Sequence, residues 1–364
     1  MMRSALSVVA GARRPGSGLR RTLGFVLAAA LGASSFGCQT VKYVSQAAKG
    51  QEDFILKAQD IDLLLAEERL PPKEKALLGQ VHAIKAFGEE KGLRPTKNYQ
   101  KYVRLHRNAA VWIVSASDPL RFRSRLWKFP IIGSITYVGW FDRKEADKFG
   151  DELRAQHLDV DVRPAGAYST LGWFEDPVLS SMIPEGPEAT GALADVISHE
   201  SLHATYYLPG QSRLNESVAN FVGQKLAQAY LIKTKGENSR ELLAYQAMDR
   251  RGVERRKMFG DAYAALDALY KSNLPDEEKL AKKAEIIADL QKRSRMSRPI
   301  NNATLIQSKT YNSGQEELER LLGACEGSFP RMIRTLERLK AEKLQPQESD
   351  VGKLIAQLGS DCAP

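Results

Sequence analysis

The stretch His199-Glu200-Ser201-Leu202-His203 decides how this chain is interpreted. It fits the pattern H-E-x-x-H, and because the chain has only 5 histidines in 364 residues, chance is a weak explanation for it. Residues four apart on an α-helix lie about 40° apart around the axis, since each residue advances about 100°. His199 and His203 would therefore direct both imidazoles toward one point. The stretch predicts a helix that binds a metal ion through these two side chains.

A metal ion held by this helix needs a further ligand from elsewhere in the chain. Zinc in a hydrolytic site takes three protein ligands and leaves one position for water. Pro209-Gly210 predicts a turn after the first helix, so the next helix would fold back against it. Glu216 lies in the first turn of that second helix. We therefore expect a zinc site formed by His199, His203 and Glu216.

Glu200 is adjacent to a ligand but points sideways from the ligand face of the helix. Zinc lowers the pKa of a bound water toward about 7. Glu200 could accept the proton of that water and pass it to the leaving amine, as general base and acid. Zinc-bound histidines usually donate their other N–H group to a nearby acceptor. Asp195, one turn before His199, and Asn220, one turn after Glu216, are the candidates.

The same residues also have a structural explanation. Apolar neighbours share the helical face of His199 and His203, so both rings could be half-buried core residues. Glu216 could simply be an acidic residue in a first turn, where the helix dipole favours negative charge. The complete motif followed by Asn215-Glu216 makes metal binding the preferred interpretation.

The first 37 residues have the features of an export signal. Five arginines and an apolar stretch over residues 23–33, too short for a confident transmembrane helix, are followed by small residues and Gly37-Cys38. This order resembles a bacterial lipoprotein signal, in which Cys38 becomes the lipidated first residue, and Gln39 after it is typical of outer-membrane sorting. We expect a periplasm-facing lipoprotein attached to the membrane through Cys38. The alternative is ordinary cleavage nearby.

The composition is that of a globular protein with a substantial core, with 43% hydrophobic and 27% charged residues. Residues 1–37 contain five arginines and no acid, so the remaining chain has 48 basic against 44 acidic side chains and a net charge of +4 rather than +9. No basic patch with interleaved aromatic residues occurs, so nucleic acid is not expected as a partner. Cys325 and Cys362 could form a disulfide in an oxidising periplasm, or remain free.

Hydrophobic periodicity predicts an α+β fold with a small mixed sheet, an active-site helix pair and a large helical C-terminal half. Residues 38–235 would form the catalytic region, with N-terminal helices and the sheet, and residues 236–364 a helical region packed on it. The expected elements are a tether over 38–50; helices over 51–68, 72–91, 143–157, 188–207 and 212–232; strands over 110–115, 120–127, 131–141 and 158–163; a solvated helical hairpin over 236–298; and helices near 313–326, 329–343 and 350–358.

The metal motif resembles the gluzincin branch of the zincin metallopeptidases. More closely, the chain resembles a bacterial family of lipoprotein aminopeptidases. The matching segments are Cys38 with residues 43–51, residues 130–133 with 137–142, residues 168–182 and residues 199–223. The resemblance implies a zincin-like fold, zinc dependence and cleavage of peptides near a free amino end. The segment between His203 and Glu216 is shorter than in the best-known gluzincins, which leaves little room for inserted substrate-binding structure.

The resemblance also suggests where a peptide substrate would bind. Zincins generally place a substrate-pairing edge strand before the zinc helix, so we expect residues 168–174 to lie along the cleft. Glu175 or Asp176 could bind a substrate ammonium, or could simply cap the loop before Pro177. Tyr206 or Tyr207 could stabilise a developing oxyanion, or pack between helices.

These observations predict a zinc-dependent metallopeptidase, an aminopeptidase, with a peptide as its substrate. A metalloendopeptidase would differ only in how the cleft is closed. A non-catalytic envelope scaffold that retains a zincin fold is a third interpretation. The presence of Glu200 argues against the scaffold, because a protein that only binds metal needs the histidines and not Glu200.

Overall fold

The computed structural model describes residues 38–67, 70–129, 133–168, 175–310, 314–340, 344, 350–358 and 362–363. The predicted export signal over residues 1–37 lies outside these ranges. So do residues 169–174, which make up most of the predicted substrate strand. Among the described residues, no helix is both long enough and apolar enough to span a membrane.

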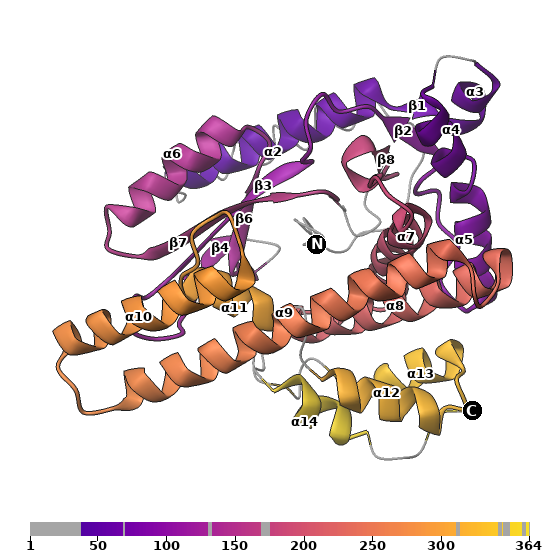
Figure 1. The fold of residues 1–364 in the computed structure, drawn as a ribbon. Helices are drawn as coiled ribbons and strands as arrows, with labels where there is room; N and C mark the ends of the chain where they lie inside the picture. The colour runs from indigo at the N-terminus through magenta and orange to yellow at the C-terminus, as the bar shows by residue number, and fades with distance from the viewer. Residues whose placement is uncertain are drawn as a thin grey trace.

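The fold is α+β, as predicted, with small sheets and many helices (Figure 1). The central sheet has the order β6-β3-β7, with β3 over Val111–Ser117, β6 over Tyr137–Trp140 and β7 over Asp159–Ala165. Both pairings are antiparallel, and Val114 lies opposite Val138 on one side and Val162 on the other. All residues of β3 are buried, because α6 (Arg143–Arg154) packs on one side of the sheet and α11 (Asn302–Thr310) on the other.

The other strands of the described residues form two smaller sheets. One has the order β1-β2-β8 and is mixed, since β2 pairs antiparallel with β1 and parallel with β8; the other is the hairpin β4-β5. These strands are β1 (Gln59–Asp60), β2 (Lys101–Val103), β4 (Trp127–Phe129), β5 (Gly133–Ile135) and β8 (Val178–Leu179). The remaining elements are α2 (Cys38–Lys57), α3 (Ile61–Ala66), α4 (Pro72–Leu78), α5 (Val81–Glu90), η2 (Ser180–Met182), α7 (Ala189–Thr205), α8 (Ser212–Lys235), α9 (Arg240–Lys271), α10 (Asp276–Ser294), α12 (Gln315–Ala324), α13 (Phe329–Leu336) and α14 (Val351–Ala356).

The predicted tether over residues 38–50 is wrong, because these residues form most of helix α2. Apolar side chains on one face of this helix pack against the sheet and its flank. The Tyr43 ring lies 5.9 Å from that of Trp140, and the Phe54 ring lies 5.3 Å from that of Phe141. Hydrophobic periodicity did not predict this helix over residues 38–50, because polar residues separate the few aromatic side chains on its buried face.

The predicted strand over residues 120–127 is also wrong for most of its length. The segment is a loop with an isolated bridge between Ser117 and Ser124, and β4 begins only at Trp127. Phe122 instead stacks on Tyr263 of α9, with ring centroids 3.7 Å apart. The alternation of apolar and basic residues therefore reflects a loop anchored to a distant helix rather than the pleat of a sheet.

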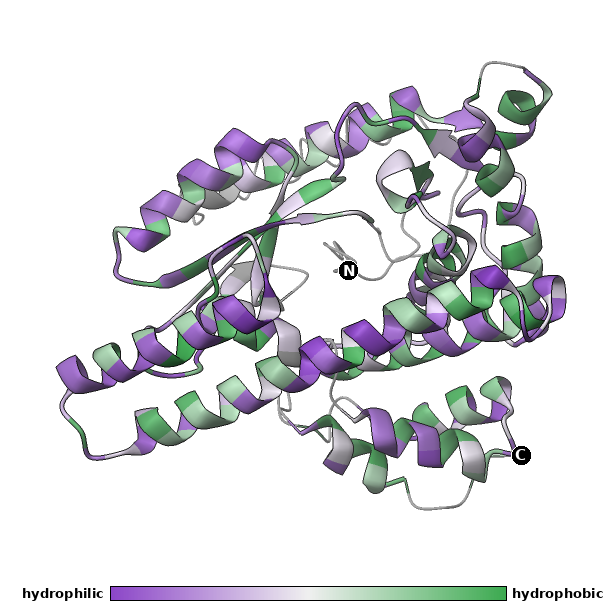
Figure 2. Cartoon of the chain, viewed as in Figure 1, coloured by the Kyte–Doolittle hydropathy of each residue, from purple (hydrophilic) through white to green (hydrophobic). Residues whose placement is uncertain are grey.

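The predicted helical hairpin over residues 236–298 is confirmed as α9 and α10, which run side by side (Figure 1). Hydrophilic residues cover much of both helices (Figure 2). A small apolar cluster that includes Phe259, Leu266 and Leu290 lies between the hairpin and the start of α11. This arrangement gives two charged helices a narrow apolar seam, as expected for a solvated hairpin.

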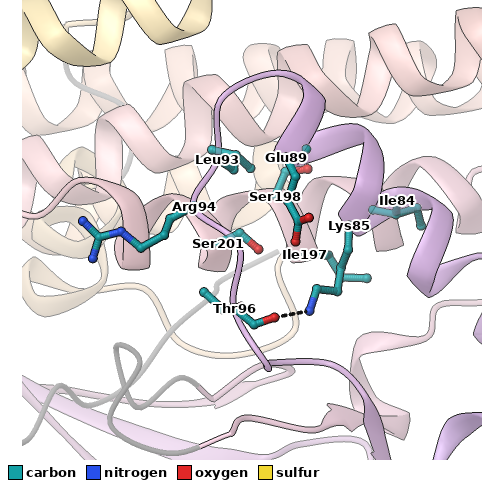
Figure 3. A pocket seen from close by; sticks show the side chains of 10 residues that line it. Ile84, Lys85, Glu89, Leu93, Arg94, Thr96, Ile197, Ser198 and Ser201 are labelled. Carbon is teal, nitrogen blue, oxygen red and sulfur yellow. Dashed lines mark hydrogen bonds between the residues drawn. The ribbon is translucent and has the colours of Figure 1, made fainter. Parts of the chain in front are cut away.

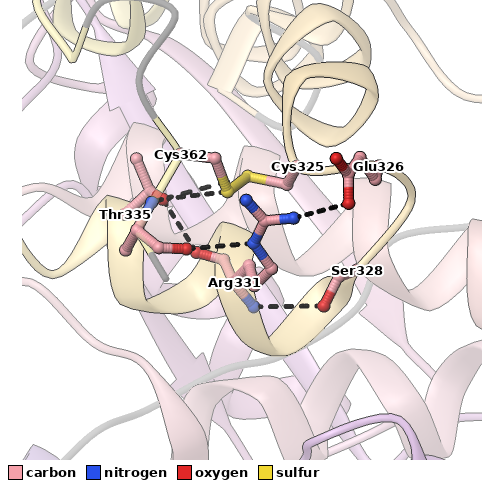
Figure 4. Close-up of a disulfide and its surroundings, with 7 residues drawn as sticks. Cys325, Glu326, Ser328, Arg331, Thr335 and Cys362 are labelled. Atoms are coloured by element: carbon pink, nitrogen blue, oxygen red, sulfur yellow. Dashed lines mark hydrogen bonds and ion pairs between the residues drawn. A yellow bond between two sulfur atoms is a disulfide. The ribbon is translucent and has the colours of Figure 1, made fainter.

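The C-terminal segment is held by a disulfide between Cys325 and Cys362 (Figure 4). Thr335 of α13 donates a hydrogen bond to the Cys362 sulfur and accepts one from the Ala363 N–H group at 2.8 Å. Arg331 also donates to the Ala363 carbonyl at 3.1 Å. The last described residues are therefore bound covalently to Cys325 at the end of α12 and by hydrogen bonds to α13.

Candidate metal centre

The H-E-x-x-H motif lies on helix α7, which packs along α8 (Figure 1). Every residue of α7 from Ala189 to His203 is buried, so this helix passes through the interior of the protein. His199, Glu200 and His203 each offer one ligand atom, and these atoms lie within 4.8 Å of one another. The structure therefore forms a buried His–Glu–His group that could hold a metal ion.

Glu216 of α8 completes the cluster. One of its carboxylate oxygens lies 3.5 Å from His199 Nε2 and the other lies 3.7 Å from His203 Nε2. The Glu216 residue is only 7% exposed. The expected juxtaposition of the two histidines with Glu216 is thus present, and both Nε2 atoms face the same carboxylate.

Burial determines the protonation state of His203. It lowers the pKa of this ring to about 4, because a charged imidazolium would lose its hydration. Within the described residues, neither ring nitrogen of His203 makes a hydrogen bond. The ring is therefore neutral near pH 7, which is the form that binds metals. Two imidazoles and one carboxylate on facing helices make a donor set that fits zinc.

Asn215 and Gly223 both contribute to the geometry of the α7–α8 pair. Asn215 closes the connection between the helices: its side-chain oxygen accepts from the Leu208 N–H group and its amide donates to the Leu208 carbonyl, both at 2.9 Å. Gly223 allows close approach further along, because a Cβ there would lie 2.6 Å from an Asp195 carboxylate oxygen and 3.2 Å from His199 Cβ. Sequence reasoning assigned no role to either residue. Gly223 lies on the same helical face as Glu216. Because glycine weakens a helix interior by about 1 kcal/mol relative to alanine, its presence there indicates a position where another helix comes close.

The other candidate residues have varied surroundings. Asp195 is buried beside α8, whereas Asn220 is half-buried. Glu175 is half exposed, with its carboxylate oxygens 3.8 Å from the Lys97 ammonium and 3.9 Å from that of Lys101. Asp176 is buried, and its backbone carbonyl accepts a hydrogen bond from Tyr99. Glu175 therefore faces lysine side chains, and the backbone of Asp176 is bonded to that of Tyr99.

The two tyrosines after the motif also differ. Tyr206 is buried, and its hydroxyl donates to the Leu336 carbonyl of α13 at 3.4 Å. Tyr207 is 41% exposed. For Tyr206 the contact is the packing between helices that the sequence offered as an alternative to oxyanion stabilisation.

A small pocket lies against α7, away from the two histidines (Figure 3). It lies between α5, the following loop and α7, and Ile197, Ser198 and Ser201 supply its α7 wall. Because successive helical residues are about 100° apart, Ser201 points away from the side of His199 and His203. This pocket is therefore not the space around the His199, Glu200 and His203 side chains.

The fold and the cluster define a class: a mixed α+β protein with a buried His–Glu–His group able to bind a metal ion. The family described as "Putative aminopeptidase" matches residues 42–350, and the chain belongs to this family. The matched range includes all of α7 and α8. The predicted relationship to an aminopeptidase family is confirmed, and the family name suggests a peptidase. No curated protein and no solved structure matches the chain.

Proposed function

We propose that this protein is a zinc-dependent aminopeptidase with a zincin-like site. The observation that carries the proposal is the convergence of His199, His203 and Glu216, whose carboxylate oxygens lie 3.5 and 3.7 Å from the two Nε2 atoms. These three side chains would hold the metal. The family to which the chain belongs supports peptides as the substrate class.

Glu200 has the catalytic role in this proposal. Bound zinc would supply Lewis acidity, activating water for attack and polarising the scissile carbonyl. Glu200 is next to His199 and is 2% exposed. One of its carboxylate oxygens lies within 4.8 Å of a ligand atom of each histidine, although Glu200 is not one of the three ligands named above. It would accept the proton of the attacking water and deliver that proton to the leaving amine. The buried surroundings strengthen these electrostatic interactions, because little water screens them.

The test of substrate class is incubation of the zinc-loaded protein with a mixed peptide library, followed by mass spectrometry of the products. Loss of single residues from the amino end is the expected result. Internal cuts would replace the aminopeptidase assignment by an endopeptidase. No cleavage by a zinc-containing protein would favour a scaffold. Glu185→Gln, which changes an exposed acid, serves as the control and should leave the products unchanged.

We also infer that the protein is exported and attached to the membrane through Cys38. The arginine-rich start, the apolar stretch over residues 23–33 and Gly37-Cys38 support this inference. Helix α2 begins at Cys38, so a lipid there would be joined directly to a helix. Metabolic labelling with a fatty-acid analogue should mark the wild type and not Cys38→Ala. Equal labelling of the two proteins, or none in either, would contradict the inference.

A further inference from the structure

Asn215 makes contacts that the proposed chemistry does not use. The residue is 2% exposed, and both polar atoms of its side chain are bonded to one backbone residue, Leu208. The carboxamide therefore pairs with a peptide group in both directions, as a donor and as an acceptor. Leu208 lies in the connection between α7 and α8, and it is buried as well. This pair of bonds ties the first turn of α8 to the segment that leaves α7.

We propose that Asn215 is the positioning residue for Glu216. By fixing the first turn of α8 against Leu208, it keeps the Glu216 carboxylate directed toward His199 and His203. The inference rests on the proposed function, because Glu216 needs this orientation only if it binds the metal together with the histidines.

The geometry follows from helix periodicity. Asn215 and Glu216 are adjacent, so their side chains diverge by about 100° around the axis of α8. Any rotation of the first turn about that axis moves both side chains together. Two 2.9 Å bonds to Leu208 oppose such a rotation at the end of α8 that carries the ligand. Backbone bonds also lie nearby: the Asn215 N–H group donates to the Gln211 carbonyl, and the Gln211 N–H group donates to the Leu208 carbonyl. These bonds restrain the main chain, whereas the carboxamide bonds restrain a side chain of the first turn directly.

A residue that only stabilised the fold would affect the melting temperature and not the metal. Asn302 at the start of α11 provides a matched comparison. It is fully buried, and its amide donates to the Asp118 and Pro119 carbonyls at 2.9 and 3.1 Å. Asn302→Ala therefore removes these two bonds and the one that its Oδ1 accepts from the Tyr270 hydroxyl at 2.7 Å, at a place where no proposed metal ligand is adjacent.

The experiment compares the wild type, Asn215→Ala and Asn302→Ala by zinc competition against a chelator, at a temperature well below all three melting points. Asn215→Ala should bind zinc 10–100-fold more weakly, the usual effect of removing a group that orients a ligand. Asn302→Ala should melt earlier and bind zinc within threefold of the wild type. The visible spectrum of the cobalt-substituted protein should change for Asn215→Ala alone, because it reports on ligand geometry.

Hydrogen exchange in the unmutated protein tests the same coupling without a folding defect. Zinc should slow exchange of the Leu208 amide more than that of the Asn302 amide, which also bonds to a side chain, because coupling between two sites is reciprocal. If the wild type binds no zinc, the proposed function itself is overturned. If the wild type binds zinc but Asn215→Ala has the same affinity and cobalt spectrum, or if zinc slows both amides equally, only the role of Asn215 is overturned.

Discussion

In the proposed site, the buried carboxylate of Glu216 is the negatively charged ligand of the metal ion. A carboxylate removed from water is costly unless a cation or hydrogen bonds compensate. Glu216 is 7% exposed, and its carboxylate oxygens lie 3.5 Å from His199 Nε2 and 3.7 Å from His203 Nε2. A zinc ion would supply the compensating positive charge. Zinc binding is thus expected to stabilise the folded protein, and Glu216 should contribute to that effect.

Glu216→Gln tests this expectation at a single residue. The amide removes the negative charge that would attract the metal ion, so zinc should raise the melting temperature of the variant less than that of the wild type. The variant should also bind zinc more than about 100-fold more weakly, a larger effect than the loss of a group that merely orients a ligand. Thermal melting with and without zinc measures both quantities. A variant that gained as much stability from zinc as the wild type would show that Glu216 is not a ligand.

The pKa of His203 gives the metal-free protein a pH dependence of known sign. The folded-state pKa is about 4, below the ordinary value of 6.5. As the pH falls from 6.5 toward 4, the unfolded chain binds a proton that the folded protein does not, so the free energy of unfolding decreases. Urea unfolding of metal-free protein across this range should show a smaller decrease for His203→Gln. Identical slopes for the two proteins would contradict the buried neutral ring.

At the level of elements, the α7–α8 pair depends on close approach as well as on ligands. Gly223 is on α8, and the atoms that an added Cβ would meet belong to Asp195 and His199 of α7. Part of this neighbourhood is backbone, since the Asp195 carbonyl oxygen would lie 2.9 Å from that Cβ. A side chain at Gly223 would therefore push α8 away from α7 beside His199, a proposed metal ligand.

Gly223→Ala should therefore lower both stability and zinc affinity, although alanine favours a helix more than glycine does. We expect a loss of about 1–3 kcal/mol of unfolding free energy, as for other overpacked sites. Gly260→Ala on α9 is the control, because nothing lies within 4 Å of its added Cβ, and it should stabilise the protein by about 0.5–1 kcal/mol. Denaturant unfolding and zinc competition measure the two effects. A stabilised Gly223→Ala protein with unchanged zinc affinity would refute the close approach.

The sequence predicted the parts of this pair that depend on local periodicity. The spacing of His199 and His203 and the turn before Glu216 follow from helix geometry and turn chemistry, so they could be inferred without a structure. The contacts of Asn215 with Leu208 and of Gly223 with α7 could not, because they depend on how two helices meet. The strand expected over residues 120–127 failed for a related reason: its alternating pattern serves a contact with α9 that only the folded chain creates.

At the level of the whole molecule, the C-terminal helices are tied to the end of α7. Tyr206 follows α7 directly, and its hydroxyl bonds to the Leu336 carbonyl at the end of α13. The disulfide joins Cys362 to Cys325 at the end of α12, and Thr335 of α13 donates a hydrogen bond to the Cys362 sulfur (Figure 4). This segment therefore supports the protein on the side where α7 ends.

Replacing both disulfide cysteines by serine should cost roughly 2–4 kcal/mol of unfolding free energy, since the bond restricts the unfolded chain. Zinc affinity should stay within about threefold of the wild type, because no proposed ligand lies on α13. The comparison is denaturant unfolding of the oxidised wild type, the reduced wild type and the double variant. A double variant as stable as the oxidised wild type would contradict a supporting role for the bond.

The central claim is that His199, His203 and Glu216 bind zinc while Glu200 moves the proton. The most direct test measures zinc content and peptide hydrolysis together in Glu200→Gln. The account predicts one zinc ion per chain, as in the wild type, and a loss of hydrolysis of at least about 100-fold, the lower end for general acid–base catalysis. Hydrolysis at the wild-type rate by Glu200→Gln, or a wild-type protein that binds no zinc, would contradict it.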